Sequence, residues 1–230
     1  MSRVLITGAN RGIGLELTRQ CLERGDEVIA ACRRPDSAKE LLALRDAHEK
    51  LSILPLELND EGSLERFVKE LDGQAIDIFI NNAGIYGQRD ARIGNIDAAS
   101  WHEAFHVNTI APMLLTERLL PQLREGKDRK LIYMSSKMGS IADNGSGGSY
   151  VYRSSKTALN QVVKSLAGDL ASDGFTVLTL HPGWVRTDMG GPNGLIDTDT
   201  SAKGLLQVID GASAADSGRF IAYDGKDIPW

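Results

Sequence analysis

Short runs of β-branched and aliphatic residues alternate along this chain with longer stretches that have a helical pattern of apolar residues. The apolar runs occupy residues 3–7, 27–32, 51–56, 76–80, 130–135 and 175–180, with a further one at 219–223. The helical stretches are 13–24, 37–49, 61–72, 100–125, 151–172 and 199–210. Near-continuous apolar runs of this length are typical of strands buried on both faces of a parallel sheet. Because such strands are joined by right-handed helical crossovers, the pattern predicts an α/β fold with one Rossmann-type, doubly wound parallel sheet flanked by helices.

The length and composition predict one domain over residues 1–230. Hydrophobic residues make up 42% of the chain and charged residues 25%, which permits a sizeable buried core and is typical of globular proteins. The Gly/Ser-rich piece 144–149 is expected to be a loop inside this domain rather than a linker.

Charge and hydropathy argue against several classes of function. A formal net charge of -5 disfavours a nucleic acid or an anionic membrane as partner, because both favour a basic face. No run reaches the ~18 apolar residues of a membrane span, and the first residues lack the apolar core of a signal peptide. Cys21 and Cys32 lack a metal-ligand spacing, and His102 and His106 have no third ligand placed to complete a site. We therefore expect a cytoplasmic protein with reduced thiols and no metal site.

A glycine-rich loop follows the first predicted strand and leads into the first predicted helix. Its spacing is G-x-x-x-G-x-G, and glycines at this junction let a pyrophosphate approach the free N–H groups of the helix N-terminus. We predict that the loop contacts a dinucleotide through Gly8, Asn10, Arg11, Gly12, Ile13 and Gly14. Glycines that only form a turn would produce the same sequence pattern. The position of the loop between a strand and a helix is what favours nucleotide binding.

The end of the second predicted strand indicates which dinucleotide is bound. A carboxylate at this place would bind the ribose 2′-hydroxyl of NAD, but here Cys32 is followed by Arg33 and Arg34. Guanidinium groups pair well with phosphate, and Arg11 in the glycine loop adds a third positive charge. The sequence therefore predicts NADP(H) as the cofactor, the alternative being two solvated surface arginines.

Polar and small residues follow the third and fourth predicted strands. Glu57 and Leu58, with Asn59 after them, are placed to lie near an adenine ring, although polar residues at a strand end need no function. Asn82, Ala83 and Gly84 are predicted to pass close to the cofactor. A structural role, with the Asn side chain binding backbone, fits this second segment equally well.

Tyr152 and Lys156 are four residues apart on a predicted helix, so the phenol and the ammonium share one face. A tyrosine has a pKa near ~10, too high for proton exchange around neutrality. A neighbouring ammonium stabilises the phenolate, so we expect Lys156 to lower the pKa of Tyr152. The pair then fits a general acid for a carbonyl oxygen that receives a hydride. An exposed Tyr and Lys at this spacing are common by chance, and only the rest of the chain favours the catalytic interpretation.

Several motifs, taken together and in order, resemble those of the short-chain dehydrogenases/reductases. They are TGANRGIG (7–14), NNAG (81–84), HVNTIAP with Asn108, IYMSSKMG with Ser136, YRSSK (152–156) and HPGWVRTDM (181–189). YRSSKTALN and the ending SGRFIAYDGKDIPW are similar in particular to the subgroup of sniffer and C-factor carbonyl reductases. The resemblance implies an NADPH-dependent oxidoreductase that reduces ketones, aldehydes or quinones to alcohols.

The resemblance also assigns catalytic roles. It implies that Tyr152 protonates the carbonyl oxygen and that Lys156 holds the nicotinamide ribose, so that both contact the cofactor. Ser136 would bind the substrate oxygen, with Ser135 as the weaker candidate. Asn108 would hold a water that links Lys156 to solvent.

The same resemblance implies further cofactor contacts and a second candidate function. Pro182 and Gly183 end the sixth strand and would contact the cofactor, and Val185 and Thr187 would meet the nicotinamide carboxamide. The short segment after Thr187 suggests a permissive site for bulky or varied carbonyl compounds.

A nucleotide-binding signalling protein of C-factor type, with incidental turnover, is the alternative function. Relatives use apolar helix faces to associate, so we expect a homodimer.

Overall fold

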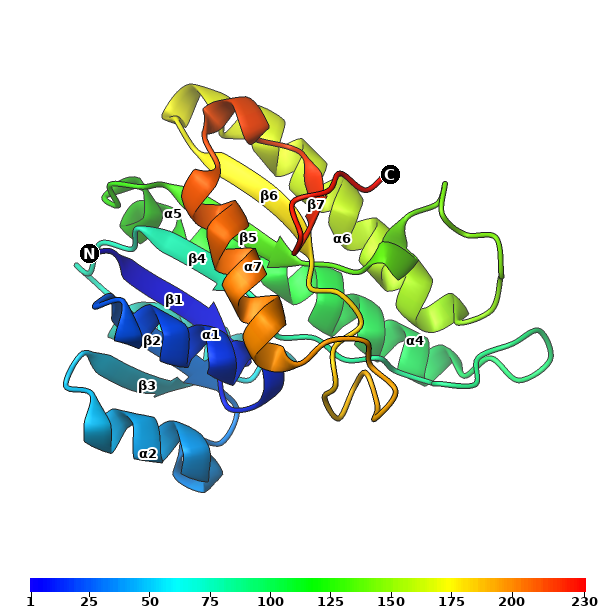
Figure 1. Ribbon diagram of the computed structural model, residues 1–230, viewed down its shortest axis with the longest axis horizontal. Coiled ribbons are helices and arrows are strands. Elements are labelled where there is room, and N and C mark those ends of the chain that lie inside the picture. Colours follow the sequence, from blue (N-terminus) through cyan, green and yellow to red (C-terminus); the bar gives the residue numbers. More distant parts are fainter.

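The computed structural model describes residues 1–230 and contains one sheet of seven strands (Figure 1). The strands are β1 (Arg3–Thr7), β2 (Glu27–Cys32), β3 (Leu51–Pro55), β4 (Ile78–Asn81), β5 (Lys130–Met134), β6 (Thr176–His181) and β7 (Phe220–Ala222). Their order is β3-β2-β1-β4-β5-β6-β7, and every neighbouring pair is parallel. The predicted parallel sheet is therefore confirmed.

Helices cover both faces of this sheet. They are α1 (Gly12–Glu23), α2 (Lys39–Ala47), α3 (Glu61–Glu70), α4 (Ala98–Phe105), α5 (Ala111–Arg124), α6 (Tyr150–Asp169) and α7 (Thr198–Gly211). Side chains alternate along each strand, so Leu5 of β1 joins the core under α3, α5 and α6, whereas Val4 and Ile6 join the core under α1 and α7. The doubly wound architecture is thus built from two apolar layers, one on each face. No helix combines the length and apolar character that a membrane span requires.

The strand order reverses between β1 and β4. The chain proceeds from β1 through β2 to β3 in one direction, then returns to place β4 on the other side of β1, with Val4 opposite Ile78. In open α/β sheets, ligands bind outside the carboxyl ends of the strands at such a reversal. The loops that follow β1 and β4 therefore define where a site is expected.

Two predicted helices differ from those in the structure. The stretch predicted at 100–125 begins earlier, where Asp97 accepts a hydrogen bond from the Ala99 amide, and it contains a π-helical turn at His106–Ile110. Such turns insert one residue into an α-helix and are frequent at functional sites. The stretch predicted at 37–49 is shorter, because Pro35–Ser37 form a 3₁₀ turn before α2.

Candidate active site

The glycine-rich loop brings the backbone of β1 and α1 into close contact. Gly12 begins α1 with φ +55°, a left-handed conformation that favours glycine. A Cβ on Gly14 would overlap the Gly8 carbonyl oxygen and would lie 2.5 Å from Asn82 Nδ2. Neither a side-chain cap nor an acidic residue occupies the start of α1. The loop therefore leaves the free N–H groups of α1 available to an anion, which fits a dinucleotide pyrophosphate.

Asn82 connects the two loops at the strand reversal. Its Nδ2 donates to the carbonyl oxygens of Thr7 at 3.0 Å and Gly8 at 3.2 Å. The Thr7 hydroxyl in turn accepts hydrogen bonds from the amides of Asn82 and Ala83, both at 3.1 Å. The side chain thus has the structural role considered above. Cofactor contact by Asn82, Ala83 and Gly84 stays a prediction.

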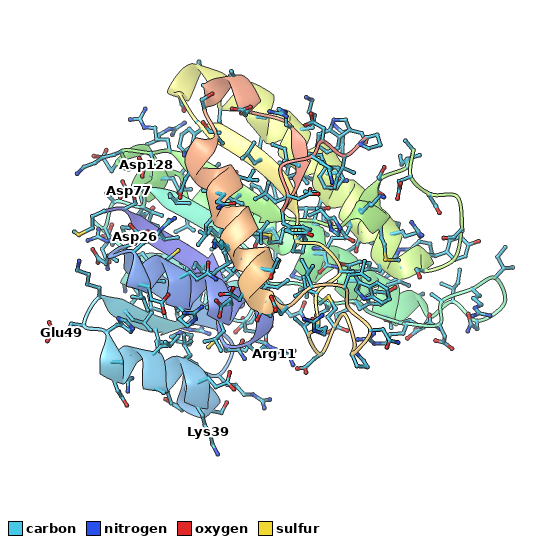
Figure 2. The ribbon with its side chains drawn as sticks, in the orientation of Figure 1. Arg11, Asp26, Lys39, Glu49, Asp77 and Asp128 are labelled. Atoms are coloured by element: carbon cyan, nitrogen blue, oxygen red, sulfur yellow. The ribbon has the colours of Figure 1, made fainter.

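The three arginines predicted to bind the 2′-phosphate differ in their contacts within the chain. Arg33 and Arg34 directly follow β2, are exposed and take part in no ion pair. Arg11 instead lies directly before α1 (Figure 2). Its Nη1 is 2.8 Å from the Oδ2 of Asp188, a residue of the loop between β6 and α7. The free guanidinium groups at the end of β2 are therefore those that fit a 2′-phosphate.

The loop after β6 folds over the start of α1. Gly183 has φ +88°, and Val185 is buried and forms a bridge with Ile196. A Cβ on Gly12 would meet Thr187 at 3.4 Å, which places Thr187 beside the glycine-rich loop. Sequence-predicted residues from opposite ends of the chain therefore meet here.

Tyr152, Lys156 and Ser136 come together between α6 and the end of β5. Lys156 donates from Nζ to the Met134 carbonyl oxygen at 2.8 Å, and Nζ lies 5.9 Å from the centroid of the Tyr152 ring. Ser136 begins a 3₁₀ turn and accepts a hydrogen bond from the Met138 amide at 3.1 Å. Both Tyr152 and Lys156 are buried. The predicted triad thus forms one group at the end of a central strand.

The expected lowering of the Tyr152 pKa by Lys156 is wrong for this structure. Burial raises the pKa of Tyr152 to about 12, with the nearby Ser136 hydroxyl opposing the rise and Tyr86 adding to it. Burial also lowers the pKa of Lys156 to about 8. Both groups are removed from water, and burial is the largest cause of each shift. Tyr152 is therefore a neutral phenol at pH 7, the form that a proton donor needs.

Asn108 lies in the π-helical turn and its side chain is fully buried. Its Nδ2 donates to the Ile85 carbonyl oxygen at 2.8 Å and to Ser155 Oγ at 2.9 Å, and its Oδ1 accepts from the Ile85 amide at 2.9 Å. The side chain therefore joins the loop after β4 to α6. A water relay through Asn108 stays a prediction, since both amide protons are already used.

Comparison with known proteins agrees with this geometry. The family model described as short chain dehydrogenase matches residues 2–195. The chain belongs to the short-chain dehydrogenase family. C-signal of Myxococcus xanthus is 45% identical over 155 residues, which cover 67% of this chain and 93% of that protein. Members of this family are oxidoreductases, and the resemblance predicted from the motifs is confirmed.

Two solved structures of the same family superpose over the whole chain. The carbonyl reductase Sniffer of D. melanogaster has a TM-score of 0.95 and 35% sequence identity, with 100% of each chain covered. The NADPH-bound carbonyl reductase from chicken fatty liver has a TM-score of 0.93 and 36% identity, covering 100% of this chain and 99% of that chain.

The residues expected near an adenine ring, Glu57 and Leu58, make contacts with other residues of the chain. The Glu57 carboxylate accepts a hydrogen bond from the Asn59 amide at 3.2 Å. Leu58 is buried in the core, and its carbonyl oxygen lies 3.0 Å from His106 Nε2. His106 thereby has a structural partner. Contact of Glu57 and Leu58 with a cofactor stays a prediction.

Sequence reasoning missed two residues beside Tyr152. Tyr86 stacks on Tyr152 with ring centroids 4.4 Å apart and an interplanar angle of 10°. The Arg89 guanidinium carbon lies 5.2 Å from the Tyr86 centroid, on a loop that also contacts the segment after Thr187. No local pattern identifies this stack, because Tyr86 and Tyr152 are far apart in sequence. Their position soon after the NNAG motif is the one available signal.

Proposed function

We propose that the protein is an NADPH-dependent carbonyl reductase that converts ketones, aldehydes or quinones to alcohols. The observation that carries this proposal is the grouping of Tyr152, Ser136 and Lys156 at the end of β5, next to the glycine-rich loop at the strand reversal. When bound, NADPH supplies a hydride to the carbonyl carbon. The chain supplies the proton and the orientation of both partners.

The residues that would hold NADP(H) fit such a molecule by shape and charge. The N-terminus of α1 offers unpaired amide groups, and Arg33 and Arg34 offer guanidinium groups without an acidic partner. The proposed cofactor contacts are Gly8, Asn10, Arg11, Gly12, Ile13, Gly14, Arg33, Arg34, Glu57, Leu58, Asn82, Ala83, Gly84, Tyr152, Lys156, Pro182, Gly183, Val185 and Thr187.

The proton step uses the neutral phenol of Tyr152. Because burial keeps its pKa at about 12, the hydroxyl is protonated at pH 7 and donates to the carbonyl oxygen as the hydride reaches carbon. Ser136 donates a hydrogen bond to the same oxygen. Lys156 is cationic below its pKa of about 8 and holds the cofactor ribose. Hydride and proton together convert the carbonyl to an alcohol.

The loss of NADPH absorbance on adding a panel of ketones, aldehydes and quinones to the purified protein tests this function. We expect turnover with NADPH that exceeds turnover with NADH. Tight NADPH binding without turnover of any panel member would contradict it and would favour the second candidate below.

Arg33→Asp is expected to reverse the cofactor preference. A carboxylate at the end of β2 repels a 2′-phosphate and binds the ribose hydroxyl of NADH, so the NADPH/NADH ratio of kcat/KM should fall by about 100-fold. Arg45→Asp makes the same change of charge on α2 and should leave the ratio unaltered. An unchanged ratio in Arg33→Asp would contradict the assignment of NADP(H).

The efficiency of the enzyme is expected to fall above about pH 8. Burial lowers the pKa of Lys156 to about 8, so rising pH removes its charge while Tyr152 stays protonated. The pH profile of kcat/KM for NADPH reports ionisations of the free enzyme and should show this decline. Lys156→Arg, which stays cationic, should lose the decline in its residual activity. A wild-type profile that is flat to pH 10 would refute the role of Lys156.

A second candidate is a nucleotide-binding signalling protein, and the similarity to C-signal supports it. The buried Tyr152 favours catalysis, because binding a nucleotide needs no proton donor.

We also propose that the protein is a cytoplasmic homodimer. Ile110 is 47% exposed at the start of α5, and its burial against a second copy would remove apolar surface from water. Light scattering after gel filtration tests the dimer.

A further inference from the structure

Two loops lie at the end of the molecule that is remote from α2 (Figure 1). Residues from both loops line one cleft. One loop follows β4 and contributes residues 89–93. The other precedes α6 and contributes residues 146–149, and Tyr150 at the start of α6 completes the lining. The cleft has a volume of 610 Å³, and three of its ten lining residues are hydrophobic. A polar cleft of this kind favours a ligand with polar or charged groups over an apolar one.

The cleft adjoins the proposed general acid. Its lining residue Ser149 has its hydroxyl 3.3 Å from the hydroxyl of Tyr86, and the ring of Tyr86 stacks on Tyr152. Arg89, which also lines the cleft, lies over the Tyr86 ring. One aromatic ring thus lies between the cleft and Tyr152, which places the cleft close to the position where the carbonyl of a substrate would be reduced.

Positive charge gathers around this cleft although the chain as a whole has a net charge of -5. Arg89 and Arg92 line it, and Arg153 donates to the hydroxyl of the lining residue Ser146 at 3.0 Å. None of these three arginines takes part in an ion pair, and the Nε of Arg153 is buried without a partner. Asp90 supplies the one carboxylate among the lining residues and accepts a hydrogen bond from Asn95 Nδ2 at 3.3 Å.

The guanidinium groups differ in their availability. Arg89 donates to the carbonyl oxygens of Asp188 and Met189, whereas the side chain of Arg92 has no hydrogen-bond partner within the chain. A free guanidinium group matches the geometry of a carboxylate and binds it through two parallel hydrogen bonds. Arg92 is therefore the group that a ligand would engage first, with Arg89 and Arg153 adding to the positive potential.

We propose that this cleft binds a carboxylate carried by the substrate, so that carbonyl compounds with a carboxylate at the end remote from the carbonyl are preferred. The inference rests on the proposed reductase function and names its substrate class. The reduction itself is unchanged: hydride goes to the carbonyl carbon, the Tyr152 proton goes to the oxygen, and the carboxylate is not consumed.

The test compares 4-carboxybenzaldehyde with its methyl ester, which differ in the charge at the remote end. At low ionic strength we expect the wild-type kcat/KM for the acid to exceed that for the ester by about tenfold, and added salt should reduce this ratio. Arg92→Glu should lower the acid-to-ester ratio by about tenfold or more. Arg45→Glu, the same charge reversal on α2, should leave the ratio unchanged.

Each outcome distinguishes the cleft from the reductase function. Equal kcat/KM for acid and ester, or a ratio that Arg92→Glu does not change, would overturn the carboxylate site while turnover of the ester retains the reductase. If neither aldehyde is turned over, calorimetric titration with both compounds still decides the inference. Binding of the acid that is lost in Arg92→Glu supports the site, and absence of binding to the wild type overturns it.

Discussion

Replacing Tyr152 with phenylalanine is expected to lower turnover by about 10²–10⁴-fold, the range typical for loss of a positioned proton donor. Phenylalanine keeps the ring that stacks on Tyr86 and removes the hydroxyl alone. The change should therefore reduce kcat for each carbonyl compound and leave NADPH binding intact. Single-turnover NADPH oxidation and quenching of protein fluorescence by NADPH measure the two effects separately.

Tyr133→Phe is a matched control for this variant. Tyr133 is another buried phenol, and its hydroxyl bonds to Thr116 Oγ1 on α5 rather than to any group of the site. It should lose about 1 kcal/mol of stability and keep its turnover. If Tyr152→Phe retained wild-type kcat, another group would have to supply the proton.

Gly14→Ala is expected to remove cofactor binding and to destabilise the fold by about 1–3 kcal/mol or more. The added Cβ would overlap the Gly8 carbonyl oxygen, which is backbone and has no room to yield without moving the loop. It would also approach the Asn82 amide that joins the two loops. Thermal unfolding with and without NADPH measures both effects, and the shift that NADPH gives the wild type should vanish.

Gly168→Ala makes the same substitution where space exists. Gly168 lies in α6 with nothing within 4 Å of its added Cβ. Alanine forms helix better than glycine, so this variant should be unchanged or more stable by up to about 1 kcal/mol. A Gly14→Ala protein with wild-type melting temperature and NADPH affinity would contradict this prediction. It would show that the loop can move to accommodate the added Cβ.

Much of the fold was predictable because the pattern that determines it is local. Strands buried on both faces read as continuous apolar runs, and residues 3–7 and 27–32 match β1 and β2 at both ends. The π-helical turn at His106–Ile110 was not predictable. It inserts one residue into an otherwise helical pattern, and its partners Ile85 and Ser155 lie in other elements.

The candidate site shows the same division. The motifs place Ser136 just after β5, and Tyr152 and Lys156 in the first turns of α6. The end of β5 and the start of α6 lie close together in this fold, so the grouping of the three residues was predictable. The pKa of Tyr152 did not follow, because it is raised by burial, and burial is a property of the packed structure rather than of the local sequence. The ion pair of Arg11 with Asp188 was missed for a related reason, since it depends on the path of the loop after β6.

The central position of β1 has a consequence for how the chain reaches its native state. One edge of β1 pairs with β2, and the other edge pairs with β4, which comes later in the chain. In the second pairing Leu5 lies opposite Phe79 and Ile6 opposite Ile80. During synthesis, therefore, the first strands emerge with an unpaired edge of apolar residues. Such an edge recruits strands from other chains. We expect the nascent protein to depend on chaperones until β4 has emerged and closed this edge.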